Sequence, residues 1–411
     1  MGRPNESLAF VFRFRVLLLS AMAGATVAAL AALIIQAEGN DLVLVGPLLA
    51  AVILSLAIVF LRVRHFYLAI ATVLAPLPGL VWAGILAAPG PQTIILVYTF
   101  AVALSIFIAG MVADSVARGE SAEPAASRAF TRVLVSCALT VLLLSVLLVI
   151  WFVQEPEKIA ITGIQMGFSC LSALIITPLV ASGLRYSEAY LEAFNRLREA
   201  RGRVMESMAM VAVPRWGVSF AGIALVFAVL GWFGANDLIR DTEFLAQPAL
   251  WIASIVAIFL SGYALGGGWR NATALAGAFV TVLTCGLWAL EETGIQLTNV
   301  DFMELPLAMA GSLLAALILL VRAERYRRTG DHVSVGLLRA IEKCGISIFY
   351  SGLAGLVSLA PLTLSHPEWP ALAVMVVMGG LAAGIFMPAF ATLLEAIFPR
   401  RRTLEEVFGK R

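Results

Sequence analysis

Long apolar stretches separated by short polar segments recur along the whole chain. Each stretch holds about twenty mostly apolar residues, the length that an α-helix needs to cross the roughly 30 Å hydrocarbon core of a membrane. Twelve stretches are predicted to span: 14–36, 42–61, 67–88, 92–113, 133–153, 158–182, 216–234, 246–265, 272–290, 302–321, 345–364 and 370–396. The pattern predicts an all-α, polytopic membrane protein.

The composition supports this fold class and excludes several functions. Of 411 residues, 61% are hydrophobic and 13% are charged, whereas a soluble domain is about 25% charged. The net charge of +2 does not suggest nucleic acid as a partner. No HExxH, GxSxG or intramembrane carboxylate pair supports catalysis, so we expect neither an enzyme nor a cofactor. The cysteines lack CxxC spacing, so neither a zinc site nor a disulfide framework follows; they are Cys137, Cys170, Cys285 and Cys344.

The basic residues predict the orientation of the chain. Short outward loops disfavour Lys and Arg. If the N-terminus is cytoplasmic, only Lys158 and Arg240 among the 28 basic residues lie outside. A miscounted helix would invert every later loop and destroy this bias. We therefore expect an inner (cytoplasmic) membrane protein with both termini in the cytoplasm, and we interpret 14–36 as an uncleaved helix rather than a signal peptide.

Matching features in the two halves predict an internal repeat. The fifth helices begin with "RVLVSC" at 132–137 and "RAIEKC" at 339–344, an R-x4-C pattern repeated at an offset of 207 residues. The sixth helices end around Pro178 and Pro388, which are 210 residues apart. Each half also has a long basic inward loop between its fourth and fifth helices, at 115–132 and 322–344. These features favour two parallel, pseudo-symmetric six-helix repeats related by an axis along the membrane normal.

The repeats divide the chain into three parts. Residues 1–184 form the first six-helix repeat, 185–215 a cytoplasmic connector, and 216–411 the second repeat. Within 185–208, Tyr190 and Phe194 belong to an apolar stripe at three- and four-residue steps, which predicts an amphipathic helix. We expect this helix to lie flat on the inner leaflet and to tether the two halves, with a regulatory or partner-docking surface as the alternative.

One region resembles a known family. It comprises "GIQLTNVDFMELPLAMAG" at 294–311, then "ERYRRTG", then the two following helices to residue 396. This stretch resembles the last three helices of a repeat in the resistance-nodulation-division (RND) superfamily and looks closest to the MmpL-like branch of lipid and hopanoid exporters. The resemblance is weaker over 92–182. It implies transport of a hydrophobic or lipid-like molecule.

The chain departs from this family in two respects. Family members place large extracytoplasmic domains after the first and seventh helices, whereas the loops here are only about 37–41 and 235–248. The family's fourth helices usually hold a mid-membrane Asp for proton coupling, and the corresponding positions here are Phe107 and Leu314. We therefore expect that the usual carboxylate relay is absent.

Two acidic residues near membrane spans remain as candidates for coupling, because intramembrane ionisable groups often serve function. Asp114 in "GMVADS" matches the family's Gly-x-x-x-Asp, although it lies beside Arg118 and Glu120. Glu304 lies close to Asp301 at the outward end of the tenth helix. The alternative for both is a solvated helix end.

Three function classes remain open. The first is a transporter or flippase for a hydrophobic or lipid-like molecule. The second is a non-transporting membrane subunit or assembly factor that retains an RND-like fold and binds other membrane or extracytoplasmic subunits. The third is a major-facilitator carrier, although "FLRVRHFYL" lacks the Gly-x-x-x-Asp-x-x-Gly-Arg signature expected after the second helix. Membrane lipids or a hydrophobic substrate are the partners that we expect.

Overall fold

A computed structural model of the 411-residue chain provides the structure. It describes residues 14–36, 45–86, 91–151, 156–196, 210–235, 248–266, 268–292, 304–329, 333–361 and 369–398, with the single positions 12 and 199.

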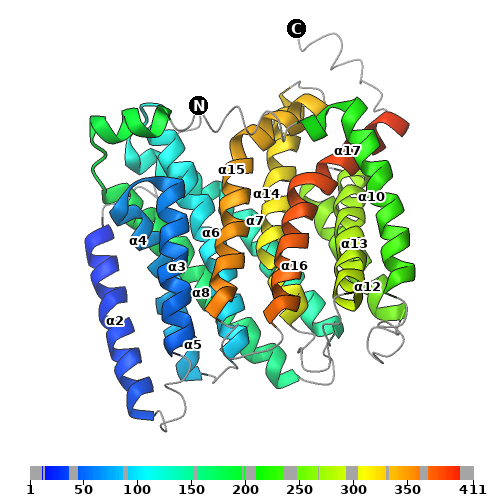
Figure 1. Cartoon of the computed structure of the whole chain (residues 1–411). Helices are drawn as coiled ribbons and strands as arrows, with labels where there is room; N and C mark the ends of the chain where they lie inside the picture. Colours follow the sequence, from blue (N-terminus) through cyan, green and yellow to red (C-terminus); the bar gives the residue numbers. More distant parts are fainter. Residues whose placement is uncertain are drawn as a thin grey trace. The chain divides into compact units, whose positions relative to one another are not determined.

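Helices make up almost all of the described part of the chain (Figure 1). The α-helices are α2 (Arg15–Gln36), α3 (Val45–Val63), α4 (Phe66–Leu74), α5 (Leu77–Leu86), α6 (Pro91–Val116), α7 (Ala122–Trp151), α8 (Pro156–Gly183), α10 (Pro214–Gly234), α12 (Pro248–Gly266), α13 (Trp269–Glu292), α14 (Glu304–Arg328), α15 (Val333–Leu359), α16 (Trp369–Leu381) and α17 (Met387–Ile397). A 3₁₀ turn, η2 (Met210–Ala212), precedes α10, and a π-helical turn, η4 (Ala382–Phe386), joins α16 to α17. No described residue lies in a β-strand.

The predicted membrane spans match these helices. Ten spans in the described residues are long and apolar enough to cross a membrane, and two shorter apolar helices, Arg15–Ala29 and Trp251–Ala264, coincide with the first and eighth predicted stretches. The all-α, polytopic fold class is thus confirmed. The third span consists of α4 and α5 together, and the twelfth consists of α16, η4 and α17.

The third span is interrupted at Ala75 and Pro76, because Pro76 and Pro78 lack the N–H that an α-helix needs. Ser172 of α8 supports this break. Its hydroxyl oxygen accepts a hydrogen bond from the Gly79 N–H at 3.3 Å and lies 3.3 Å from the Pro76 carbonyl oxygen, to which it can donate. A hydroxyl from a neighbouring helix thus satisfies backbone groups at membrane depth, where water cannot.

Gly79 also determines how closely α5 approaches α8. A Cβ at this position would lie 2.2 Å from the Phe168 carbonyl oxygen. Only glycine fits at this distance, so Gly79 allows the two backbones to touch.

The loops between the fourth and fifth helices of each half, which are predicted to face inward, are much shorter than predicted. α7 begins at Ala122, 11 residues before the predicted stretch, and α14 continues to Arg328. α15 then begins at Val333. These extensions are polar but rich in Ala, Arg and Glu, which favour helix. Hydropathy locates only the part of a helix that lies in the bilayer, so the prediction of long loops was wrong.

The chain forms two compact units. Unit 1 comprises Met1–Ala200, Gln296–Leu314 and Ser347–Val377; unit 2 comprises Arg201–Ile295, Ala315–Ile346 and Met378–Arg411. The central helix of unit 1 is α6, which is buried along most of its length. In unit 2, α10 packs closely against α17 and α13, because Gly217 faces Thr392 and Gly231 faces the backbone of Thr284. The predicted superposition of helices 1–6 on helices 7–12 stays a prediction.

Candidate functional site

A buried ion pair lies where α3 and α6 end. Arg62 is the penultimate residue of α3, and Asp114 lies two residues before the end of α6. The Arg62 Nη2 atom donates to the Asp114 Oδ2 atom at 2.9 Å. The Arg62 side chain is 2% exposed and the Asp114 side chain 21%. A guanidinium stays charged in proteins, so a paired carboxylate compensates its burial.

Two small residues make room for the guanidinium group. A Cβ on Gly110 would lie 2.8 Å from Arg62 Nη2 and 2.8 Å from the Ser347 Oγ atom. Arg62 Nη2 also donates to the Ser347 Oγ atom at 3.2 Å. Gly110 lies one helical turn before Asp114, so the Gly-x-x-x-Asp of "GMVADS" has a structural meaning. Because Gly110 has no side chain, the Arg62 side chain can pass across the face of α6, and the Asp114 carboxylate accepts its hydrogen bond. Ser347 adds α15 to this site, which thus joins three helices.

The connector covers this end of unit 1. Residues 188–196 are helical, as the amphipathic pattern predicts. The Tyr190 hydroxyl donates to the Val63 carbonyl oxygen at 2.8 Å, and the Asn195 Nδ2 atom donates to the Ala117 carbonyl oxygen at 3.2 Å. Phe194 is 1% exposed. Tyr190 and Asn195 thus pair with carbonyls that the ends of α3 and α6 leave without helical partners. The position of this helix on the inner leaflet stays a prediction.

An aromatic cluster holds the start of the connector. The His65 ring lies 5.1 Å from the Tyr186 ring and 5.4 Å from the Tyr190 ring, measured between centroids. His65 also caps α4, since its Nδ1 atom accepts from the Leu68 N–H at 3.3 Å. Burial raises the pKa of the Tyr186 phenol, and burial together with neighbouring Tyr186 raises the pKa of Tyr190. Tyr190 therefore stays protonated and keeps its hydroxyl available as a donor.

Buried hydroxyl groups connect α6 and its neighbouring helices in the interior of unit 1. The Tyr98 hydroxyl donates to the Val73 carbonyl oxygen at 3.3 Å. The Thr177 hydroxyl donates to the Ser105 hydroxyl at 3.2 Å. Ser55 of α3 and Ser358 of α15 lie 2.7 Å apart, measured between their hydroxyl oxygens. Hydroxyl pairs satisfy one another without placing a charge in the membrane, so they connect helices at low cost.

The two positions that the resemblance aligned with relay carboxylates are apolar and buried. Phe107 and Leu314 are both 0% exposed. Of the two sequence candidates, Asp114 lies in the ion pair, whereas Glu304 is the first residue of α14 and its side chain lies outside the described residues. The sequence did not indicate Arg62 or Ser347 as residues of this site. Arg62 was assigned to an inward loop, although the glycine one turn before Asp114 was a signal that another group crosses α6 there.

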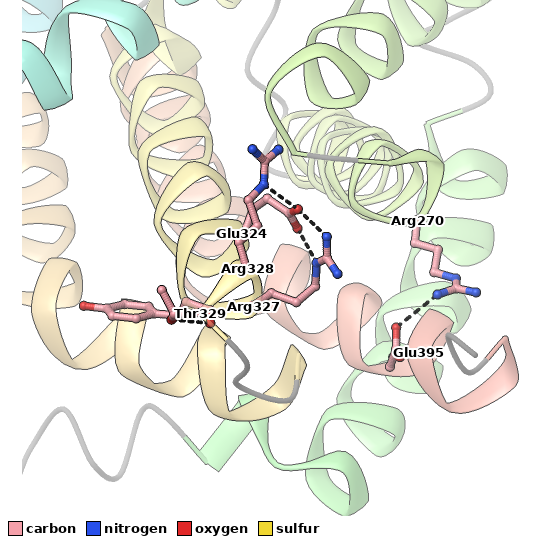
Figure 2. A network of polar contacts seen from close by, with 7 residues as sticks. Arg270, Glu324, Arg327, Arg328, Thr329 and Glu395 are labelled. Carbon is pink, nitrogen blue, oxygen red and sulfur yellow. Dashed lines mark hydrogen bonds and ion pairs between the residues drawn. The ribbon is translucent and has the colours of Figure 1, made fainter. Parts of the chain in front are cut away.

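A second polar cluster lies in unit 2, at the end of α14 (Figure 2). The Glu324 carboxylate is 4% exposed and accepts two hydrogen bonds from Arg327, at 2.8 and 2.6 Å. Arg328 donates to the same carboxylate at 3.3 Å. Figure 2 shows the carboxylate between the two guanidinium groups. Cations at the last turn also complement the helix dipole, so this cluster stabilises the end of α14.

Another ion pair in unit 2 joins two helices. Arg270 of α13 lies 3.4 Å from Glu395 of α17, and both side chains are largely buried (Figure 2). Among the described residues, no three His, Cys, Asp or Glu side chains could hold a metal ion together. The four cysteines are free.

Solved structures, but no family model or curated protein, match this chain. The crystal structure of SecDF, a translocon-associated membrane protein from Thermus thermophilus, matches with a TM-score of 0.61 and 12% identity, over 86% of this chain and 62% of the SecDF chain. SecDF in its super-membrane-facing form matches with a TM-score of 0.59 and 11% identity, over the same shares.

This likeness concerns the fold alone, because the sequences are only 11 to 12% identical. The chain therefore has a polytopic transmembrane fold like that of SecDF. The chain spans less than two thirds of the length of the SecDF chains that it matches.

Proposed function

We propose that this RND-like membrane protein moves a hydrophobic, lipid-like molecule, and that it does so without a mid-membrane carboxylate relay. The observation that carries the proposal is the uncharged interior around α6. Phe107 and Leu314 are buried where the family resemblance places relay groups, and the polar atoms nearby are hydroxyls. An interior of this kind suits an apolar cargo, since a polar cargo would lose its hydration without compensation.

In this proposal the Arg62–Asp114 pair is a tie between helices rather than a proton carrier. A relay needs a titratable group where water is scarce, because only there does protonation change the local energy by several kcal/mol. Asp114 lies near the end of α6, and its side chain is 21% exposed. The pair links α3, α6 and α15 beneath the connector, so it is well placed to hold one conformation of a transport cycle.

The test is lipid movement in reconstituted vesicles. Purified protein is placed in liposomes that contain a fluorescent phospholipid, and the loss of outer-leaflet fluorescence after addition of a membrane-impermeant reductant reports exchange between leaflets. We expect exchange with the wild-type protein, and none with protein-free vesicles. Wild-type protein that leaves the leaflets unmixed, with phospholipid and with other amphiphiles, would refute transport.

The absence of a relay is tested with variants that remove the carboxylates. Arg62→Met/Asp114→Asn removes the carboxylate without leaving a buried guanidinium unpaired, and Glu304→Gln removes the other candidate. Glu120→Gln, which breaks a more exposed pair with Arg128, serves as the control. We expect activity per folded protein to survive all three changes and to resist an uncoupler. Loss of activity in either test variant, matched by sensitivity of the wild type to the uncoupler, would show proton coupling.

The second candidate function is an accessory subunit of a larger membrane assembly. SecDF is described as translocon-associated. Here α10 presents a row of large exposed side chains that a partner helix could cover; they include Trp216, Phe227, Trp232 and Phe233. A photo-crosslinking amino acid at position 232, in cells, separates the candidates. Crosslinks to one specific membrane protein favour a subunit role, and crosslinks to lipid alone favour a transporter.

A further inference from the structure

An open groove lies on unit 1 between α2, α5 and α8. It has a volume of about 730 Å³ and is lined by Ala25, Ala28, Ala29, Trp82, Ile85, Leu86 and Phe168. All three helices belong to predicted membrane spans. The volume lies in the range of pockets that hold one small molecule, about 300–1,000 Å³.

The sequence explains why this groove exists. Ala25, Ala28 and Ala29 recur at helical spacing, so α2 contributes only methyl groups to the lining of the groove. On the other side, Gly79 holds α5 directly against Phe168 of α8. Trp82 lies one turn beyond this contact, where the bulky side chains of α5 form a wall. Close packing on one side of α5 and small residues on the other leave the space between α2 and α5.

Two side chains in the helices that border this groove bury polar atoms without partners among the described residues. The Trp82 Nε1 atom is buried and makes no hydrogen bond there. Gln165 precedes Phe168 by one helical turn on α8; it is 1% exposed, and neither its Nε2 nor its Oε1 atom has a partner in the same part of the chain. Buried donors and acceptors normally have partners, since each unpaired group costs about 1–3 kcal/mol. Gln165 and Trp82 together offer two kinds of donor and one acceptor.

We infer that the groove binds one lipid molecule, with its hydrocarbon tail along the alanine face of α2 and an ester or hydroxyl group near Trp82 and Gln165. The apolar lining selects hydrocarbon, and the surrounding bilayer supplies it. A protein partner fits less well, because a stable interface uses about 20–30 residues on each side, whereas seven line this groove. The amide and the indole match an oxygen-rich linkage such as an ester.

This site deepens the proposed function, on which its role as a cargo site rests. The first and third predicted spans border it, and its side is open, so a lipid can reach it from within the membrane. Binding itself does not require transport. A lipid could occupy the groove in a protein that only assembles with others.

The experiment uses a phosphatidylcholine with a photoactivatable diazirine on one acyl chain, added to the purified full-length protein in mild detergent. Peptides that carry the lipid are identified by mass spectrometry. We expect labels between Ala25 and Ala29 and between Trp82 and Leu86. Ala25→Leu/Ala28→Leu fills the groove and should reduce this labelling about tenfold. The two Leu side chains take the place of about two buried methylene groups of the lipid, and losing their burial weakens binding by about that factor.

Matched variants separate binding in the groove from contact with bulk lipid. Ala23→Leu changes another side of α2, is exposed in the same way, and should leave labelling unchanged. Gln165→Leu removes the amide without filling the groove and should reduce labelling by the ester lipid several-fold. Labelling by a pure hydrocarbon probe should fall less. Gln165→Leu also keeps the test decisive if the double variant does not fold.

Three results would overturn the inference: equal labelling on all sides of α2, labelling unaffected by Ala25→Leu/Ala28→Leu, or crosslinks from the groove to a second protein. The vesicle assay is read separately. Labelling in the groove without lipid exchange would keep the site and refute transport, whereas exchange that persists in the filled variant would keep transport and refute the site.

Discussion

Replacing Asp114 by Asn should destabilise the protein by about 3 kcal/mol, because it leaves the buried Arg62 guanidinium without its counter-charge. Breaking a buried ion pair from one side typically costs about 3–5 kcal/mol. The lower end applies here for two reasons. The Asp114 side chain is 21% exposed, so water can partly replace the lost carboxylate in solvating Arg62. Arg62 also keeps its hydrogen bond to Ser347 at 3.2 Å.

The double variant distinguishes this mechanism from simple loss of packing. Arg62→Met alone should cost less than Asp114→Asn, since it leaves a carboxylate that water can reach. Arg62→Met/Asp114→Asn should be about as stable as Arg62→Met alone, because no buried charge remains unpaired. Residues in contact typically show such coupling, at about 0.5–3 kcal/mol.

The measurement is a denaturant titration in mild detergent, followed by the fluorescence of the eight tryptophans. Glu120→Gln is the control. It breaks a pair with Arg128 in which both side chains are more exposed, at 29% and 47%, and such pairs contribute at most about 1 kcal/mol. If Asp114→Asn were as stable as the wild type, or if the two single changes added in the double variant, the pair would not be what holds Arg62 in place.

The remaining predictions concern helix packing and topology. Gly79→Ala should destabilise by about 3 kcal/mol, at the upper end for overpacking, because its Cβ would lie 2.2 Å from the Phe168 carbonyl oxygen. Gly24→Ala, with nothing within 4 Å, should be neutral or stabilising in the same denaturant titration. A cysteine at Asn236 should react with an impermeant thiol reagent in intact cells and one at Arg325 should not, and reversed labelling would refute the predicted orientation.

The sequence alone was sufficient to predict the fold class and the approximate position of the apolar helices. Both depend on a local property, the run of about twenty apolar residues that a bilayer requires. The same property could not locate the helix ends in water, so α7 and α15 begin earlier than predicted. It also could not show that Ser172 of another helix supplies the hydroxyl that supports the proline break between α4 and α5.

Parts of the candidate site were visible in the sequence, and the rest were not. The pattern Gly-x-x-x-Asp indicated Asp114, and the three- and four-residue steps indicated the connector helix. Arg62, however, counted as one of many inward arginines, and nothing near Ser347 in the chain suggests a charged partner. Their meeting depends on α3, α6 and α15 packing together, with Gly110 leaving the space. The length of an apolar run determines which segments enter the membrane, whereas the pairing of Arg62 with Asp114 and Ser347, 52 and 285 residues away in the chain, is decided only when the helices pack.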